Sequence, residues 1–221
     1  MADKGVIIEY DFAATDGAKL LSRITEGFLA DLDGIPFDPT IEARHFAGGS
    51  YQGCFAEYFQ VVKTKKTALK AARDFDGLVR REFTAAVANP PSAAFANFVK
   101  TLTAKGVKVV IVTRADLEQV RGSFAALLGP SVELYHEEST TYGSMKWDAW
   151  RLACVRSGLR PYNTLAVAGS GFSVKAALRA GMGSVAVMNE RTAYQDFTGC
   201  DEFLKELNGP AAKAVLEILR V

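Results

Sequence analysis

The stretch Gly5-Val6-Ile7-Ile8-Glu9-Tyr10-Asp11-Phe12-Ala13-Ala14-Thr15-Asp16 decides the fold that we predict. An apolar run followed by acidic residues at alternate positions is typical of a buried strand that ends at Glu9 and Asp11. Ligands of open α/β sheets bind at this end of the strands. If the backbone stays extended, the two carboxylates share one small volume and need a cation or a proton between them. Solvated acidic residues at a strand end are an equally good interpretation of the spacing alone.

Composition indicates a globular protein without a strong electrostatic preference. The chain has 221 residues, of which 49% are hydrophobic and 23% are charged, enough for one sizeable core and a small second domain. Its 26 basic and 25 acidic residues give a net charge of +1, so we expect no nucleic-acid or membrane partner. Cys54, Cys154 and Cys200 are far apart in sequence, which argues against a disulfide framework or a zinc site. With no leader and no apolar run of about 18 residues, we predict a cytoplasmic protein.

The order of helical and strand patterns predicts an α/β protein with a helical insert. Apolar residues recur at helical spacing from Lys19 to about Asn89, and helices then alternate with short apolar strands after Pro91. Such alternation is typical of a parallel sheet covered on both faces. We therefore predict a Rossmann-like core of three layers, residues 1–18 and 90–221, and an inserted all-helical cap, residues 19–89. The predicted strands after the insert are 107–112, 132–135, 164–167 and 184–188. The predicted helices are 145–155 and 174–180. We expect residues 201–221 to form closing helices.

The first stretch resembles motif I of the haloacid dehalogenase-like superfamily, Asp-x-Asp-Gly-Thr with a further Asp a few residues on. By this resemblance, Glu9 takes the place of the nucleophilic Asp and Asp11 that of the general acid/base, while Phe12 and Ala13 replace Gly-Thr. An alternative alignment resembles the phosphonoacetaldehyde hydrolases of the same superfamily, with Asp11 as nucleophile. The order of strand, helical insert and helix-strand units is similar to the branch of β-phosphoglucomutase and phosphoglycolate phosphatase, so the resemblance covers the whole chain.

Two further positions resemble the phosphate-binding motifs of the superfamily. Thr113 follows a predicted strand where motif II has the Ser or Thr that binds the transferring phosphoryl group, and Arg114 beside it could add charge. Thr113 could equally cap the helix that follows. Lys146 precedes a predicted helix where motif III has its Lys, although Trp147 departs from the usual Lys-Pro sequence. Without the resemblance, Lys146 would be interpreted as a surface residue.

Motif IV has lost its acidic pair. The run from Leu165 to Met182 resembles the strand, acidic pair, Ser and helix of this motif, but Ala168 and Gly169 occupy the acidic positions. Mg²⁺ prefers near-octahedral oxygen ligands at about 2.0–2.1 Å, usually including carboxylates, so we expect no metal site and no cofactor. The backbone N–H groups of Gly169-Ser170-Gly171 could hold a phosphate or carboxylate at the helix start, although an ordinary turn explains them too.

Two functions remain open at this point. The first is a pseudoenzyme with the haloacid dehalogenase-like fold and a degenerate catalytic site, without ordinary Mg²⁺-dependent phosphatase activity, that binds a small phosphorylated or anionic molecule or a protein partner. The second is an active phosphohydrolase acting on a small phosphate ester, with Glu9 or Asp11 as nucleophile, Thr113 and Lys146 holding the phosphate, and Mg²⁺ as cofactor. The sequence identifies neither a ligand nor a protein partner.

Overall fold

The core of the protein is a six-stranded parallel sheet. The computed structural model describes residues 4–32, 34–35, 37–46 and 48–221. Within these residues the strand order is β3-β2-β1-β4-β5-β6, and every neighbouring pair is parallel. The first stretch therefore forms the central strand β1, as predicted. The strands are β1 (Gly5–Glu9), β2 (Lys108–Thr113), β3 (Val132–His136), β4 (Thr164–Ala168), β5 (Gly183–Val187) and β6 (Glu202–Leu204).

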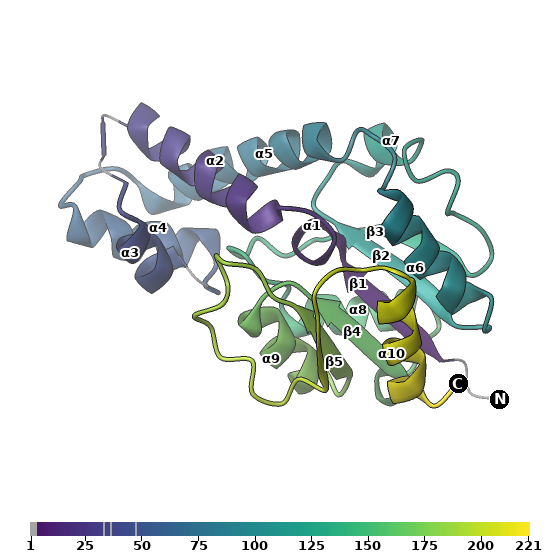
Figure 1. Cartoon of the computed structure of the whole chain (residues 1–221). Coiled ribbons are helices and arrows are strands. Elements are labelled where there is room, and N and C mark those ends of the chain that lie inside the picture. Colours follow the sequence, from purple (N-terminus) through teal and green to yellow (C-terminus); the bar gives the residue numbers. More distant parts are fainter. Residues whose placement is uncertain (1–3, 33, 36, 47) are drawn as a thin grey trace.

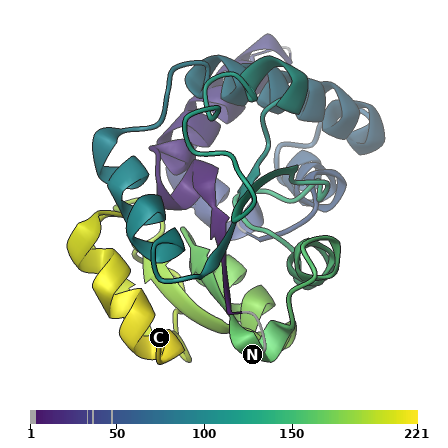
Figure 2. The same ribbon diagram turned by 90° about the vertical axis from the view of Figure 1, so that its right-hand side faces the viewer.

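Helices cover both faces of this sheet, which confirms the predicted three layers. Alternate residues of β1 point to opposite faces: Val6 and Ile8 pack with α6 (Ala93–Thr103) and α10 (Gly209–Leu219), whereas Ile7 packs with α8 (Trp147–Arg156) and α9 (Gly171–Arg179). Figure 2 shows α6 and α10 on one side of the strands and α8 on the other. The short helix α7 (Leu117–Val120) follows β2, and the 3₁₀ turn η2 (Pro161–Asn163) precedes β4.

The helical cap occupies residues 17–86, between β1 and α6. It consists of α2 (Gly17–Asp31), α3 (Pro39–Ile41), the π-helical turn η1 (Glu42–Phe46), α4 (Tyr51–Val61) and α5 (Ala68–Ala86). These helices have their own buried aromatic cluster, which includes Phe55 and Phe75. They lie beyond the carboxyl end of the strands (Figure 1). The exact domain boundaries at 19 and 89 stay a prediction.

Several details differ from the sequence-based expectations. Residues 201–221 hold one helix, α10, preceded by the edge strand β6, which pairs with β5. The predicted helix 174–180 begins earlier, at Gly171, because Ser170 caps it by accepting a hydrogen bond from the Ser173 amide. The helix predicted from 145 to 155 runs from Trp147 to Arg156. The superfamily resemblance also implies a turn at Gly34-Ile35-Pro36 after the first cap helix, of which Pro36 lies outside the described residues.

The amino end of the sheet lies opposite the cap. Lys4 Nζ donates a hydrogen bond of 2.8 Å to the Arg220 carbonyl, so the first described residue is tied to the end of α10 (Figure 1).

No helix within the described ranges is both long and apolar enough to cross a membrane.

Candidate functional site

Glu9 and Asp11 are buried where β1 ends. The chain turns directly into the short helix α1 (Tyr10–Ala13), so the backbone does not stay extended after Glu9. The expectation that both carboxylates point the same way is therefore wrong. Asp11 faces the end of β2, and Glu9 faces the end of β4. Each carboxylate consequently has its own set of partners, although both are only 2% exposed.

Asp11 is held by two donors at the carboxyl end of β2. Its Oδ1 accepts a hydrogen bond of 2.7 Å from Thr113 Oγ1, and its Oδ2 accepts one of 2.6 Å from the Arg114 amide. Burial raises the pKa of Asp11, while the charge of Arg114 and these two hydrogen bonds oppose the rise. The Thr113 hydroxyl, which the superfamily resemblance assigns to a phosphoryl group, therefore already binds a carboxylate of the protein.

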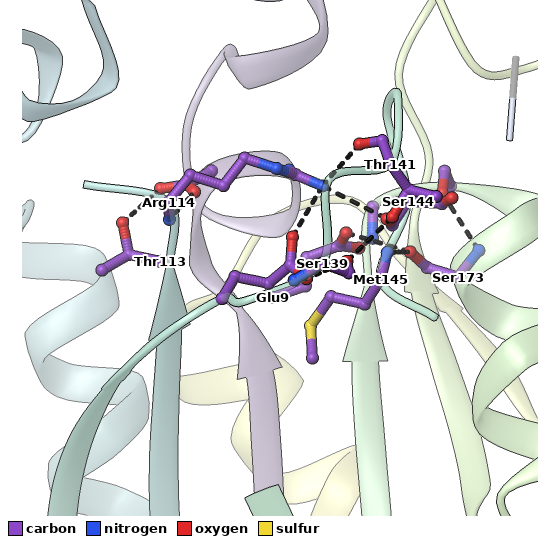
Figure 3. Close-up of polar contacts among 12 residues, drawn as sticks. Glu9, Thr113, Arg114, Ser139, Thr141, Ser144, Met145 and Ser173 are labelled. Atoms are coloured by element: carbon purple, nitrogen blue, oxygen red, sulfur yellow. Dashed lines mark hydrogen bonds and ion pairs between the residues drawn. The ribbon is translucent and has the colours of Figure 1, made fainter. Parts of the chain in front are cut away.

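Glu9 is held by two donors near the start of α9. Its Oε2 accepts a hydrogen bond of 3.1 Å from the Gly169 amide, and its Oε1 accepts one of 2.9 Å from Ser173 Oγ. Burial raises the pKa of Glu9 to about 7, although the charge of Arg114 and both hydrogen bonds lower it. Ser173 also accepts a hydrogen bond of 2.9 Å from the Met145 amide (Figure 3). It was not predicted, because a Ser in the first turn of a helix carries no signal beyond local capping.

Arg114 is the buried cation of the site. Figure 3 shows its side chain extending from the end of β2 toward Thr141 and Ser144, whose carbonyls accept hydrogen bonds of 3.4 and 3.2 Å from Nη2. Nη2 also lies 3.0 Å from Glu137 Oε2, an ion pair without hydrogen-bond geometry. Its guanidinium carbon lies 4.7 Å from the centre of the Phe12 ring. Arg114 is thus fixed by the protein itself on several sides.

Glu137 is a second residue that sequence reasoning missed. It directly follows β3, and its amide donates a hydrogen bond of 2.8 Å to the Thr113 carbonyl. Burial raises its pKa, which the Arg114 charge opposes. An acidic residue at the carboxyl end of a parallel strand was the signal that identified Glu9, and the same signal could have identified Glu137.

The other predicted site residues are placed differently. Lys146 is exposed at the start of α8, and among the described residues no hydrogen bond or ion pair joins it to Glu9 or Asp11. Lys146 is therefore not among the partners of the two buried carboxylates. The glycine-rich turn is internally bonded: the Gly169 amide binds Glu9, Ser170 caps α9, and the Gly171 amide donates to Gln195 Oε1 at 2.8 Å.

The residues at this site do not fit the Mg²⁺ ion that the superfamily resemblance implies. A Cβ atom at Gly169 would lie 2.3 Å from the carbonyl carbon of Phe12, so the backbone after β1 occupies the space of the motif IV acidic residue. Across the described ranges, no group of three or more His, Cys, Asp or Glu side chains is arranged to hold a metal ion. The four oxygens of Glu9 and Asp11 each accept a protein hydrogen bond instead.

A cavity of about 220 Å³ lies between the helical cap and the segment after β5. Phe12 lines the cavity, and the guanidinium group of Arg114 lies over the ring of Phe12. The cavity has an apolar wall and a polar rim in which Ser22 Oγ donates to Glu42 at 2.9 Å and Arg191 Nη1 donates to Ser22 Oγ at 3.2 Å. Its lining residues are Phe12, Ala18, Leu21, Pro39, Glu42, Ala43, Tyr142, Gly143, Glu190, Arg191, Thr192, Tyr194 and Gln195.

No protein-family model matches the sequence, and no curated protein matches it either. Solved structures nevertheless match the fold over nearly the whole chain. β-Phosphoglucomutase from Clostridium difficile has a TM-score of 0.72 at 12% identity, covering 99% of this chain and 97% of that one. CbbY from Rhodobacter sphaeroides in complex with phosphate has a TM-score of 0.68 at 17% identity, covering 93% and 95%.

A third structure names the superfamily. The haloacid dehalogenase-like family hydrolase from Streptococcus pneumoniae has a TM-score of 0.67 at 13% identity, covering 98% of both chains. At these identities the likeness concerns the fold. Sheet order, covered faces and an inserted helical cap agree with it. The chain therefore has the fold of the haloacid dehalogenase-like hydrolases with a helical cap.

Proposed function

We propose that this protein binds a small anionic or phosphorylated molecule and does not catalyse Mg²⁺-dependent phosphoryl transfer. The observation that carries the proposal is the packing of Gly169 against the backbone of Phe12, where a Cβ would lie 2.3 Å from the nearest carbon. A carboxylate cannot be accommodated there unless α1 moves. A metal ion at this point would thus lack an anchor that Mg²⁺ normally requires.

The hydrogen bonds of the two buried carboxylates support the same conclusion. CbbY from Rhodobacter sphaeroides was solved in complex with phosphate. In this chain the Thr113 hydroxyl, which the resemblance assigns to a phosphoryl group, donates to Asp11, as does the neighbouring Arg114 amide. A phosphate group would have to displace that carboxylate from a site where it is also close to a buried guanidinium. Because a phosphate group would compete with the Asp11 carboxylate for these donors, phosphate binding at the end of β1 is unfavourable.

The cavity beside Phe12 is the better place for a ligand. Its volume of about 220 Å³ suits a small molecule. The side chain of Arg191 on its rim is 48% exposed and supplies a cation that lies 3.9 Å from Glu42 Oε2. Gln195 supplies an amide whose oxygen is already bound to Gly171. Phe12, Ala18 and Leu21 supply apolar surface. An anionic head group at the rim with a less polar body inside would match these features.

Two assays on the purified protein test the proposal. Release of inorganic phosphate from p-nitrophenyl phosphate and from a panel of sugar phosphates should not rise on addition of 5–10 mM Mg²⁺, roughly the range that saturates weak Mg²⁺ sites. In a thermal-shift screen of phosphorylated and carboxylated metabolites, at least one compound should raise Tm in the absence of Mg²⁺. Arg191→Gln should reduce that shift, whereas Arg160→Gln, remote from the cavity lining, should not. Efficient Mg²⁺-dependent turnover would refute the proposal.

One observation favours the alternative, an active phosphohydrolase. A buried carboxyl group with a pKa of about 7, such as Glu9, is also a feature of catalytic acids and bases. In that case turnover would be measurable, and Glu9→Ala or Asp11→Ala would abolish it. Loss of turnover in these variants, with Tyr162→Ala unchanged as a control at an exposed position, would establish the hydrolase.

A further inference from the structure

Two segments from different parts of the fold pair through their backbones. Residues 48–51 lie in the cap and lead into α4, whose first residue is Tyr51, and residues 140–142 lie in the core before α8. The Tyr142 amide donates to the Gly49 carbonyl at 2.9 Å, the Tyr51 amide to the Thr140 carbonyl at 2.9 Å, and the Gly48 amide to the Tyr142 carbonyl at 3.2 Å. Ser50 and Thr141 form an antiparallel bridge. The cap and the core thus share a short piece of β-structure.

The side chain of Tyr142 crosses the same boundary. It belongs to the buried aromatic cluster of the cap, where its ring stacks on Phe75 at 6.2 Å and meets the edge of Phe46 at 5.2 Å. Its hydroxyl is within 2.7 Å of Thr25 Oγ1 and donates to Glu42. A residue of the core is therefore a structural part of the cap interior. Separating the two parts would expose this ring and break its hydroxyl contacts.

The position of these contacts matters because of where the chain connects the two parts. The chain passes from the core into the cap after Ala13 and returns to the core from Val87 onward. Both residues pack on the face of the sheet that α6 and α10 cover. The segment 140–142 leads into α8 through Met145, which packs on the opposite face. The cap is thus held by covalent connections on one face and by hydrogen bonds and Tyr142 on the other. A swing of the cap about its covalent connections would have to break these contacts.

We propose that residues 48–51 and 140–142 form a latch that keeps the helical cap fixed on the core in the ligand-free protein. The cap would then not open and close as a lid. The latch also joins the cap to Arg114, because the Thr141 carbonyl that accepts from Arg114 Nη2 lies in the latch itself. The cavity beside Phe12 would keep its shape whether or not a ligand is present. The latch is independent of the proposed function, since it concerns the empty protein.

Amide hydrogen exchange on the ligand-free chain tests the latch directly. The amides of Gly48, Tyr51 and Tyr142 should exchange at least about a hundredfold more slowly than the unstructured rate for the same sequence, because each donates a hydrogen bond within the latch. Exchange of these three amides within about tenfold of the unstructured rate, while α5 and β1 stay protected, would show that the cap opens freely and would overturn the proposal.

Variants of Tyr142 provide the second part of the test. Tyr142→Ala should speed exchange of the Gly48 and Tyr51 amides at least about tenfold and leave β1 unchanged. Tyr142→Phe keeps the ring and removes the hydroxyl contacts, so it should raise the exchange rates of these amides by a smaller factor. It also serves as the test variant if Tyr142→Ala does not fold. Tyr162→Ala, at a residue that is 69% exposed, should change nothing. Unchanged exchange of the Gly48 and Tyr51 amides in folded Tyr142→Phe and Tyr142→Ala would overturn the proposal.

Discussion

Glu9, like Asp11 and Glu137, has a pKa that burial raises, so its ionisation should contribute to how stability depends on pH. Burial raises its pKa from 4.5 to about 7. Between these values the folded protein binds a proton that the unfolded chain has released, so the stabilising contribution is complete below pH 4.5 and is lost as the pH rises to 7. With about 1.4 kcal/mol for each pKa unit, the loss could reach about 3 kcal/mol.

The variant Glu9→Gln isolates this contribution. The free energy of unfolding, measured by urea denaturation at pH 5, 6, 7 and 8, should fall with pH in the wild type and fall distinctly less in Glu9→Gln. Gln keeps one acceptor oxygen for two donors, so we expect the variant to be about 1 kcal/mol less stable at pH 5. Glu217→Gln, at an exposed position of α10, should retain the wild-type slope. Equal slopes for wild type and Glu9→Gln would show that Glu9 does not titrate in this range.

Gly169 allows a test of whether an acidic side chain, and with it a metal ion, can be accommodated at this position. Gly169→Asp puts an acidic residue where motif IV has one, but its Cβ would lie 2.3–2.4 Å from three atoms of Phe12. Overpacking against backbone should cost about 3 kcal/mol or more, and the variant should gain no stabilisation from Mg²⁺. Gly77→Asp is a matched control, since a Cβ at Gly77 meets nothing within 4 Å. A stable Gly169→Asp protein whose Tm rises with Mg²⁺ would contradict this account.

The sequence pattern places several of the candidate residues at the ends of predicted parallel strands. Glu9, Thr113 and Gly169 come together because the carboxyl ends of neighbouring parallel strands share one edge. Side-chain direction was not predictable from the sequence. Lys146 turns outward to solvent, and Arg114 turns inward to Glu137, because the path of the loop before α8 decides both.

At the scale of elements, the start of α9 joins the sheet to the loop before α8. Ser173 in its first turn donates to Glu9 and accepts from the Met145 amide, and it is fully buried. Ser173→Ala should therefore cost about 2–4 kcal/mol, since it leaves a buried N–H and a carboxylate oxygen without their partner. Ser92→Ala, which removes an ordinary N-cap of α6, should cost only about 1 kcal/mol. Urea denaturation of both variants measures the difference, and equal losses would contradict the bridging role of Ser173.

Two elements could not be predicted because their sequences carry no periodic pattern. The edge strand β6 has three residues, of which Glu202 and Phe203 are exposed, so alternation and burial give no signal. The helix α1 has four residues, and its position follows from the tight approach of Gly17 to the Asp11 carbonyl. The longer helices and the buried strands were predictable because 3.6-residue periodicity or a continuous apolar run marks them. The short helix α1 directly after β1 is what turns Glu9 and Asp11 apart.

At the scale of the whole molecule, the latch lies between the aromatic core of the cap and the core on the α8 and α9 face of the sheet. Cys54 is buried in the cap core and Cys154 is buried in the sheet core, and both are free thiols. Each thiol reports the opening of its own core by becoming accessible to a labelling reagent. A latch that holds the cap on the sheet should make the two cores unfold together.

Thiol labelling along a urea titration tests this coupling. In the wild type, Cys54 and Cys154 should become reactive with the same midpoint, as resolved by mass spectrometry. Tyr142→Ala removes an aromatic ring from the cap interior at a cost of about 3–5 kcal/mol, and with a denaturant slope of about 2 kcal/mol per M the Cys54 midpoint should fall by about 1.5–2.5 M. The Cys154 midpoint should fall less, because the core of the sheet loses no side chain. Coincident midpoints in Tyr142→Ala, or separate midpoints in the wild type, would mean that residues 48–51 and 140–142 do not couple the two cores.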